Sequence, residues 1–347
     1  MEHKDTLNNL KKQRNIVNQS NLLRKLKDPM LKKFFDLISI RKLFESIKYN
    51  KTLQKKMNLN IDYYKDYLQE FSSIELEIEP NEKKYTSFIN IKKEDEKYFH
   101  IYFNDDRKKE IKRNYINPDD NVSTIYIIID YQIKSFYKLF SNCKQIKSIS
   151  FKKFSRNNII NMYGMFSKCT SLKEINFSNF NTDNVKDMSY MFSGCTSLKE
   201  INLSNFNNNN VTDMSNMFSK GPSLEELNLN NFNTDNVTDM SYMFSGCSSL
   251  KELNLINFNT NNVNDMLGMF SGCASLKEIN LTNFNTNNVT DMNYMFFGCS
   301  SLEELNINNF NTNYVINMSF MFSHCSDELK LKIKSQFKNI KEEAFKN

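Results

Sequence analysis

The sequence predicts an α/β solenoid, which is a stack of short units that each contribute a strand and a short helix. Phenylalanine recurs every 26 residues from Phe154 to Phe310. One cysteine column follows the same period from Cys143 to Cys325, interrupted only by Gly221. Within each unit, apolar residues follow first a helical and then a strand-like spacing. A fixed period of this length indicates a stacked repeat architecture.

The first half of each unit has the spacing of a short helix. In one unit, Met240, Met243 and Cys247 lie three and four residues apart, which places them on one helical face. Asp239 is suited to start this helix and Gly246 to end it. We therefore expect short helices whose methionines and cysteines are buried in the core.

The second half of each unit has the spacing of a strand. Leu250, Leu253 and Leu255 follow the pattern L-x-x-L-x-L, and Phe258 closes the turn. This pattern is typical of the leucine-rich repeat, with a parallel sheet on the concave side and short helices on the convex side. The full motif, V-T-D-M-S-Y-M-F-S-G-C-S-S-L-K-E-L-N-L, resembles the BspA-like leucine-rich repeat family over about residues 133–325. Many bacterial members of that family are surface proteins that bind host proteins or other cells, so the resemblance implies a binding role.

The strand positions on either side of the inward leucine are expected to face the concave surface. They form a glutamate column and an asparagine column. These columns are open to two interpretations, a solvated strand face or a binding surface for a basic or amide-rich partner protein. The candidate binding residues are Glu174, Asn176, Glu200, Asn202, Glu226, Asn228, Glu252, Asn254, Glu278, Asn280, Glu304 and Asn306.

The recurring cysteines are predicted to be buried free thiols. A zinc site needs close ligand pairs, and the sequence has no C-x-x-C and only three histidines. A disulfide needs Cα atoms within about 7 Å, and we expect the helical side of the stack to be splayed more widely than that. No metal or cofactor is expected. Another asparagine column, which includes Asn231 and Asn257, is predicted to bond to turn backbone between units.

The chain is expected to contain four parts. Residues 1–73 form a basic helical module with 16 Lys/Arg and 8 Asp/Glu, and residues 26–53 weakly resemble an F-box, which implies binding to a Skp1-like subunit of a ubiquitin ligase. A β-rich segment follows at 74–123. The solenoid occupies 124–325, with Ile125 to Ile129 as a candidate first rung, and 326–347 is predicted to be a capping helix.

The function predicted from these features is a non-enzymatic protein-protein interaction scaffold. No phosphate-binding loop, zinc-protease motif or nucleophile–base pair is evident. The alternatives are a cell-surface adhesin-like protein and an F-box-type substrate adaptor. We expect a monomeric protein with a protein partner, no nucleic acid and no membrane span. No signal peptide is evident, so a cytoplasmic location is expected, with the cell surface, by unconventional export, as the alternative.

Overall fold

The computed structural model describes residues 50–56, 71–81, 86–104, 106–117 and 119–346. The chain divides into two units, residues 1–71 and 72–347. In the first unit the structure describes the short helix α4 (Lys51–Lys56). Most of the predicted helical module, including residues 26–49 of the F-box-like stretch, lies outside the described residues. The helical module and the F-box resemblance therefore stay predictions. Within the described part of the chain, no helix is both long enough and apolar enough to cross a membrane.

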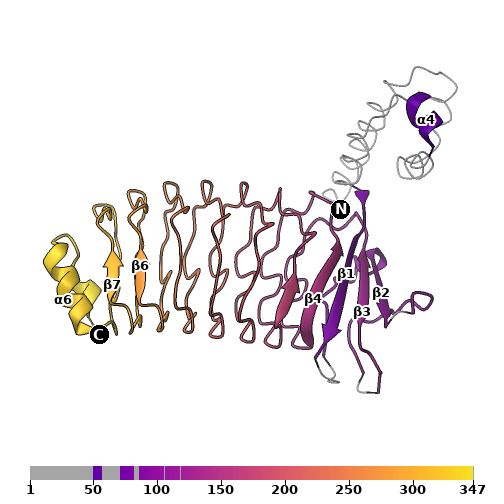
Figure 1. The fold of residues 1–347 in the computed structure, drawn as a ribbon, viewed down its shortest axis with the longest axis horizontal. Coiled ribbons are helices and arrows are strands. Elements are labelled where there is room, and N and C mark those ends of the chain that lie inside the picture. Colours follow the sequence, from indigo (N-terminus) through magenta and orange to yellow (C-terminus); the bar gives the residue numbers. More distant parts are fainter. Residues whose placement is uncertain (1–49, 57–70, 82–85, 105, 118, 347) are drawn as a thin grey trace, which may run out of the picture. The chain divides into compact units, whose positions relative to one another are not determined.

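The second unit begins with a five-stranded sheet (Figure 1). Alternation of apolar and polar residues builds its strands; in β1, for example, Ile74, Leu76 and Ile78 are fully buried and the glutamates between them face the opposite side. The strand order is β2-β3-β1-β4-β5. The strands are β1 (Ile74–Pro80), β2 (Phe99–Phe103), β3 (Ile125–Ile129), β4 (Ile146–Lys153) and β5 (Glu174–Asn176). Residues 86–91, inside the predicted β-rich segment, form no strand.

The expectation that Ile125–Ile129 is the first rung of the repeats is wrong. Strand β1 lies between β3 and β4 and pairs antiparallel with both. The first parallel pair of the repeats is β4 with β5, in which Ile149 lies beside Ile175. The predicted boundary at residues 123/124 therefore falls inside a sheet that the β-rich segment shares with the first repeats.

The convex helices predicted from the methionine and cysteine spacing are also wrong. In the unit around residue 240 the chain forms successive turns, and Tyr242 and Gly246 adopt left-handed backbone angles (φ 53° and 76°). Their N–H groups donate to the next coil, to Leu267 O at 2.7 Å and Ser271 O at 2.7 Å. In a helix those groups would bond within their own segment. Tight turns also bring residues three and four apart to one side, which explains the helical spacing.

Backbone pairing between coils is most continuous on this turn side. Isolated parallel bridges join the equivalent residues of successive coils: Ser135, Asn161, Asp187, Asp213, Asp239, Asp265, Asp291 and Asn317. On the opposite side, the described repeats form short strands at β5, β6 (Glu278–Asn280) and β7 (Glu304–Asn306), with no strand in the coils between β5 and β6. The parallel sheet predicted for that side is present only in parts.

The core of the second unit is a stack of identical side chains. In each coil one phenylalanine ring stacks on its equivalent in the next coil, with centroids 5.5–5.8 Å apart and planes within 3–11° of parallel. The paired methionines are buried around this stack, as predicted. The rings belong to Phe140, Phe166, Phe192, Phe218, Phe244, Phe270, Phe296 and Phe322.

The C-terminal segment covers the last coil. Helix α6 (Asp327–Gln336) begins at Ser326, whose hydroxyl accepts a hydrogen bond from Leu329 N, and it buries Leu329 and Ile333. The 3-10 helix η2 (Glu342–Phe345) follows, and Ala344 O accepts from Phe322 N at 2.8 Å. The Phe345 ring continues the stack on Phe322. This segment therefore satisfies bonds that another coil would otherwise supply.

Candidate functional site

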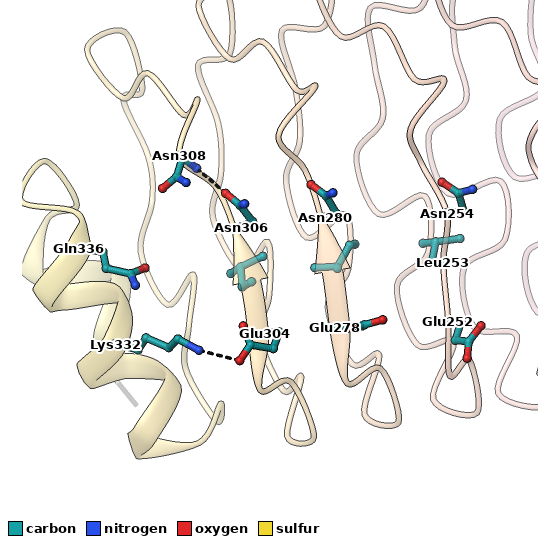
Figure 2. Close-up of a pocket in the computed structure, with 12 residues that line it drawn as sticks. Glu252, Leu253, Asn254, Glu278, Asn280, Glu304, Asn306, Asn308, Lys332 and Gln336 are labelled. Atoms are coloured by element: carbon teal, nitrogen blue, oxygen red, sulfur yellow. Dashed lines mark hydrogen bonds and ion pairs between the residues drawn. The ribbon is translucent and has the colours of Figure 1, made fainter.

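All twelve candidate residues are exposed, and Figure 2 shows how two columns are arranged at the C-terminal end of the face. In the paired strands, Glu278 lies beside Glu304 and Asn280 beside Asn306. An aliphatic residue lies between the glutamate and the asparagine of each coil, partly buried at Ile175 and buried in the other five coils, so the two polar columns are separated by an apolar line, as Figure 2 shows at Leu253. We call this surface the Glu/Asn face; its residues are Glu174, Asn176, Glu200, Asn202, Glu226, Asn228, Glu252, Asn254, Glu278, Asn280, Glu304 and Asn306.

The asparagine side chains of this face are held in one orientation by their own backbone. Asn254 Oδ1 accepts from Ile256 N at 3.1 Å, and Asn280 Oδ1 accepts from Thr282 N at 3.1 Å. The same bond, from the N–H two residues on, recurs in the other four coils. Because the oxygen is engaged in this turn, the amide nitrogen is left as the outward group. Asn254 Nδ2 donates to Asn230 Oδ1, whereas Asn280 Nδ2 has no acceptor among the described residues. The column therefore presents N–H donors.

The glutamate column is anionic and mostly unpaired. Glu304 forms an ion pair with Lys332 of α6, with Oε1 and Nζ 2.8 Å apart (Figure 2). Lys199 pairs with Glu225, in the column beside the face, at 3.3 Å. Across the described ranges, no cationic side chain lies within 4 Å of the carboxylates of Glu200, Glu226, Glu252 or Glu278. Their mutual repulsion is therefore reduced only by solvent and salt.

The face is hollowed into a groove. Toward the C-terminus, a cavity of about 590 Å³ is lined by the columns from Glu252 to Asn306 and by Lys332 and Gln336 of α6. A second cavity of about 360 Å³ extends over Glu226 and its neighbours. The two cavities share Glu252 and Asn254, so the hollow follows the columns over successive coils. The period of the repeat predicted the columns, but not the α6 wall, whose place depends on how the cap packs.

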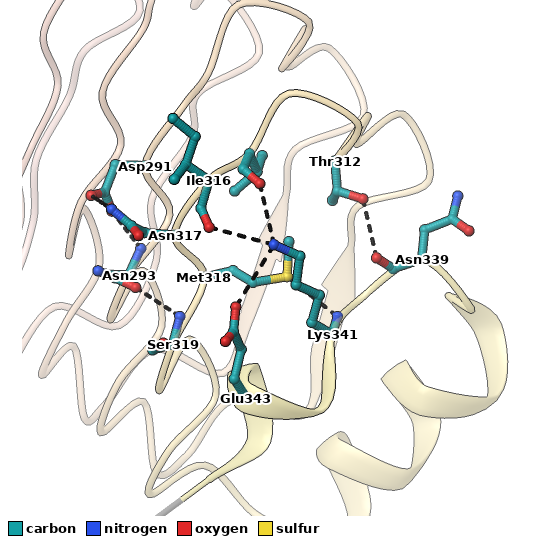
Figure 3. Close-up of polar contacts among 11 residues, drawn as sticks. Asp291, Asn293, Thr312, Ile316, Asn317, Met318, Ser319, Asn339, Lys341 and Glu343 are labelled. Atoms are coloured by element: carbon teal, nitrogen blue, oxygen red, sulfur yellow. Dashed lines mark hydrogen bonds and ion pairs between the residues drawn. The ribbon is translucent and has the colours of Figure 1, made fainter.

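The opposite, turn side carries a row of partly buried aspartates. Asp239 Oδ1 accepts from Ser241 N at 2.8 Å, and the other aspartates of the row make the same turn bond. The row ends at asparagines, and Asn317 Nδ2 donates to Asp291 Oδ2 at 2.9 Å (Figure 3). These aspartates shape turns that pair with the next coil, so the expectation that they start helices is wrong. The row comprises Asp187, Asp213, Asp239, Asp265 and Asp291.

The seven cysteines are free and buried. Cys247 Sγ donates to Phe218 O in the preceding coil at 3.2 Å, and burial raises the pKa of this thiol to about 12. The predicted reason for excluding disulfides, a wide splay of the coils, is wrong because the coils on this side are hydrogen-bonded to each other. In the described ranges, no group of three or more His, Cys, Asp and Glu residues is arranged to hold a metal ion.

The other asparagine column bonds between coils, as predicted. Asn257 Nδ2 donates to Asn230 O at 2.7 Å, and Asn231 Nδ2 donates to Ser204 O at 3.3 Å. Each bond joins a side chain to the backbone of the preceding coil. These asparagines therefore hold the stack together.

Comparison with known proteins assigns the chain to a family. No curated protein matches the chain. A leucine-rich repeat protein from Bacteroides ovatus of known structure is 22% identical, with a TM-score of 0.34; the match covers 57% of this chain and 46% of that one. This chain thus spans less than half the length of that protein. A family model described as Mycoplasma protein of unknown function, DUF285, matches residues 134–255 and 247–342, which together are more than half of the chain. The chain belongs to the family described as Mycoplasma protein of unknown function, DUF285.

Proposed function

We propose that this protein is a non-enzymatic protein-binding module that engages a basic partner protein through the Glu/Asn face. The observation that carries the proposal is the groove, in which unpaired carboxylates and outward amide donors follow the same coils. A cationic partner would relieve the repulsion between stacked carboxylates, so binding and the stability of this face favour each other.

The partner is expected to associate by electrostatic attraction followed by local pairing. Carboxylates of one sign along a groove raise the local concentration of cationic groups and speed association at low ionic strength. The amide donors then select groups with free acceptors, and the buried aliphatic line contributes apolar contact. We expect the affinity to fall as salt is added.

Charge reversal tests the assignment. In affinity capture with quantitative mass spectrometry, Glu226→Lys combined with Glu252→Lys is expected to remove the partners that the unaltered chain captures. Glu328→Lys, at an exposed glutamate of α6 that lines neither cavity, is the matched control and should retain them. Circular dichroism should show the same fold in all three proteins. If the double variant still captures the same partners, the Glu/Asn face is not the binding face.

A further inference from the structure

We propose that the segment bound in the groove is an extended stretch in the polyproline II conformation that carries a lysine at every third residue. This inference rests on the proposed function, because it specifies the chemistry of the partner at the same face. It follows from the spacing of the glutamates, the orientation of the asparagines and the one ammonium group already bound in the groove.

The spacing of the coils favours this conformation. The coils are joined in register by the parallel pairing of β6 with β7 and, along the turn side, by the isolated parallel bridges. Parallel pairing sets successive coils about 4.8 Å apart, so every second glutamate recurs at about 9.6 Å. A polyproline II chain rises about 3.1 Å per residue, so its third residue recurs at about 9.3 Å on the same side. An extended β-strand repeats at about 6.7 Å and an α-helical turn at about 5.4 Å, and neither matches one or two coils. The glutamates two coils apart are Glu174, Glu226 and Glu278.

The asparagine column favours the same kind of segment. The fixed oxygen bond to Thr282 N leaves the Asn280 amide nitrogen as a donor, and Asn306 is held in the same way through Asn308 N. Such donors need acceptors from the ligand. A polyproline II chain has no internal hydrogen bonds, so all its carbonyls are free to accept, whereas an α-helix uses its carbonyls internally. Proline rings would lie on the aliphatic line that includes Leu253.

The groove already contains a bound ammonium group at its C-terminal end. Lys332 Nζ lies 2.8 Å from Glu304 Oε1, which shows that the carboxylates of this column accept a lysine from across the groove (Figure 2). Because Lys332 occupies Glu304, the coils available to a partner are those before it. Glu226 and Glu278 lie two coils apart, and neither forms an ion pair among the described residues. Their coils line the two cavities.

Synthetic peptides test the inference with the full chain. The first peptide is Lys-Pro-Pro-Lys-Pro-Pro-Lys, and the second has the same composition with its three lysines adjacent. Calorimetric titration at low ionic strength should show that the first binds about two- to fivefold more tightly, because its lysines can pair with Glu226 and Glu278 together, which adds one ion pair of ordinary surface strength. Glu226→Gln and Glu278→Gln should each weaken the first peptide about two- to fivefold, whereas Glu328→Gln should leave it unchanged.

The outcomes separate this inference from the proposed function. If both peptides bind with equal affinity and Glu226→Gln lowers both affinities, the face binds cations whatever their spacing. The inference is then overturned, while the proposed function stands. If neither peptide binds, or if the glutamine variants do not weaken the first peptide, the inference is also overturned. The proposed function is then decided by the charge-reversal capture alone.

Discussion

Replacing Asn208 with threonine is expected to stabilise the repeat stack. Asn208 is 2% exposed, and neither atom of its amide group has a hydrogen-bond partner. Other units have a threonine at this position. Thr260 Oγ1, for example, donates to Asn285 O at 2.9 Å and accepts from Asn285 N at 2.8 Å. In Asn208→Thr the hydroxyl is placed to make the same two bonds with the backbone of Asn233.

The expected gain follows from the energy of buried polar groups. A buried amide without a partner costs about 1–3 kcal/mol, and each hydrogen bond regained contributes about 0.5–1.5 kcal/mol. Small movements of Asn208 in the folded state reduce the cost of its unpaired amide group. We therefore expect the free energy of unfolding to rise by about 1–3 kcal/mol.

Urea unfolding followed by circular dichroism measures this change. The matched control is Asn264→Thr, which makes the same substitution at an exposed position where Thr238 and Thr290 stand in neighbouring units; it should change stability by less than about 0.5 kcal/mol. The reverse substitution, Thr260→Asn, should destabilise the protein. A midpoint for Asn208→Thr that is unchanged or lower, at constant urea dependence, would refute the reasoning.

Three further predictions follow from the turn side. Burial, and to a smaller extent neighbouring aspartates, raise the pKa of the Asp213 carboxyl. The fold therefore loses stability as the pH rises from about 4 through this raised pKa, because the carboxyl ionises more easily in the unfolded chain. In urea unfolding, Asp213→Asn should therefore stabilise more at pH 7 than at pH 4, and an equal effect at the two pH values would contradict this. Gly164→Ala should lower the free energy of unfolding by about 1 kcal/mol, because the residue has a left-handed backbone conformation. Gly268→Ala should destabilise the protein more, because its added Cβ would also clash with the Tyr242 ring. Equal losses of stability in thermal unfolding would contradict this. A thiol reagent at pH 8 should modify none of the seven buried cysteines until urea is added.

The repeat itself was predictable from sequence because stacking places one residue type at one position in every coil. The buried methionines and cysteines and the bonding role of Asn231 and Asn257 all follow from that rule. The backbone conformation was not predictable in the same way. Residues three and four apart share a side in a helix and also in successive turns, and the difference lies in the direction of N–H groups such as Tyr242 N.

The ends of the repeats were the least predictable part. Ile125–Ile129 is an apolar strand close to the position expected for an earlier repeat, yet β1 pairs between it and β4. A strand contributed from 45 or more residues earlier in the chain has no local signal at the position where it inserts. The groove wall has the same origin, because the place of Lys332 depends on the packing of Leu329 and Ile333 under α6.

The glutamate column and the aspartate row differ in what their carboxylates already bind, and this difference favours the Glu/Asn face as the binding face that we propose. Each carboxylate of the aspartate row is bonded to backbone two residues on, and the row ends at Asn161 and Asn317, which donate to the terminal aspartates. A ligand there would have to compete with bonds that hold the turns. Glu226 and Glu278 have no such bonds among the described residues, so they exchange only water for a partner. A carboxylate that is free in the folded chain binds a cation without breaking a bond of the fold, and of these two columns it is the glutamate column that offers such carboxylates, at Glu226 and Glu278.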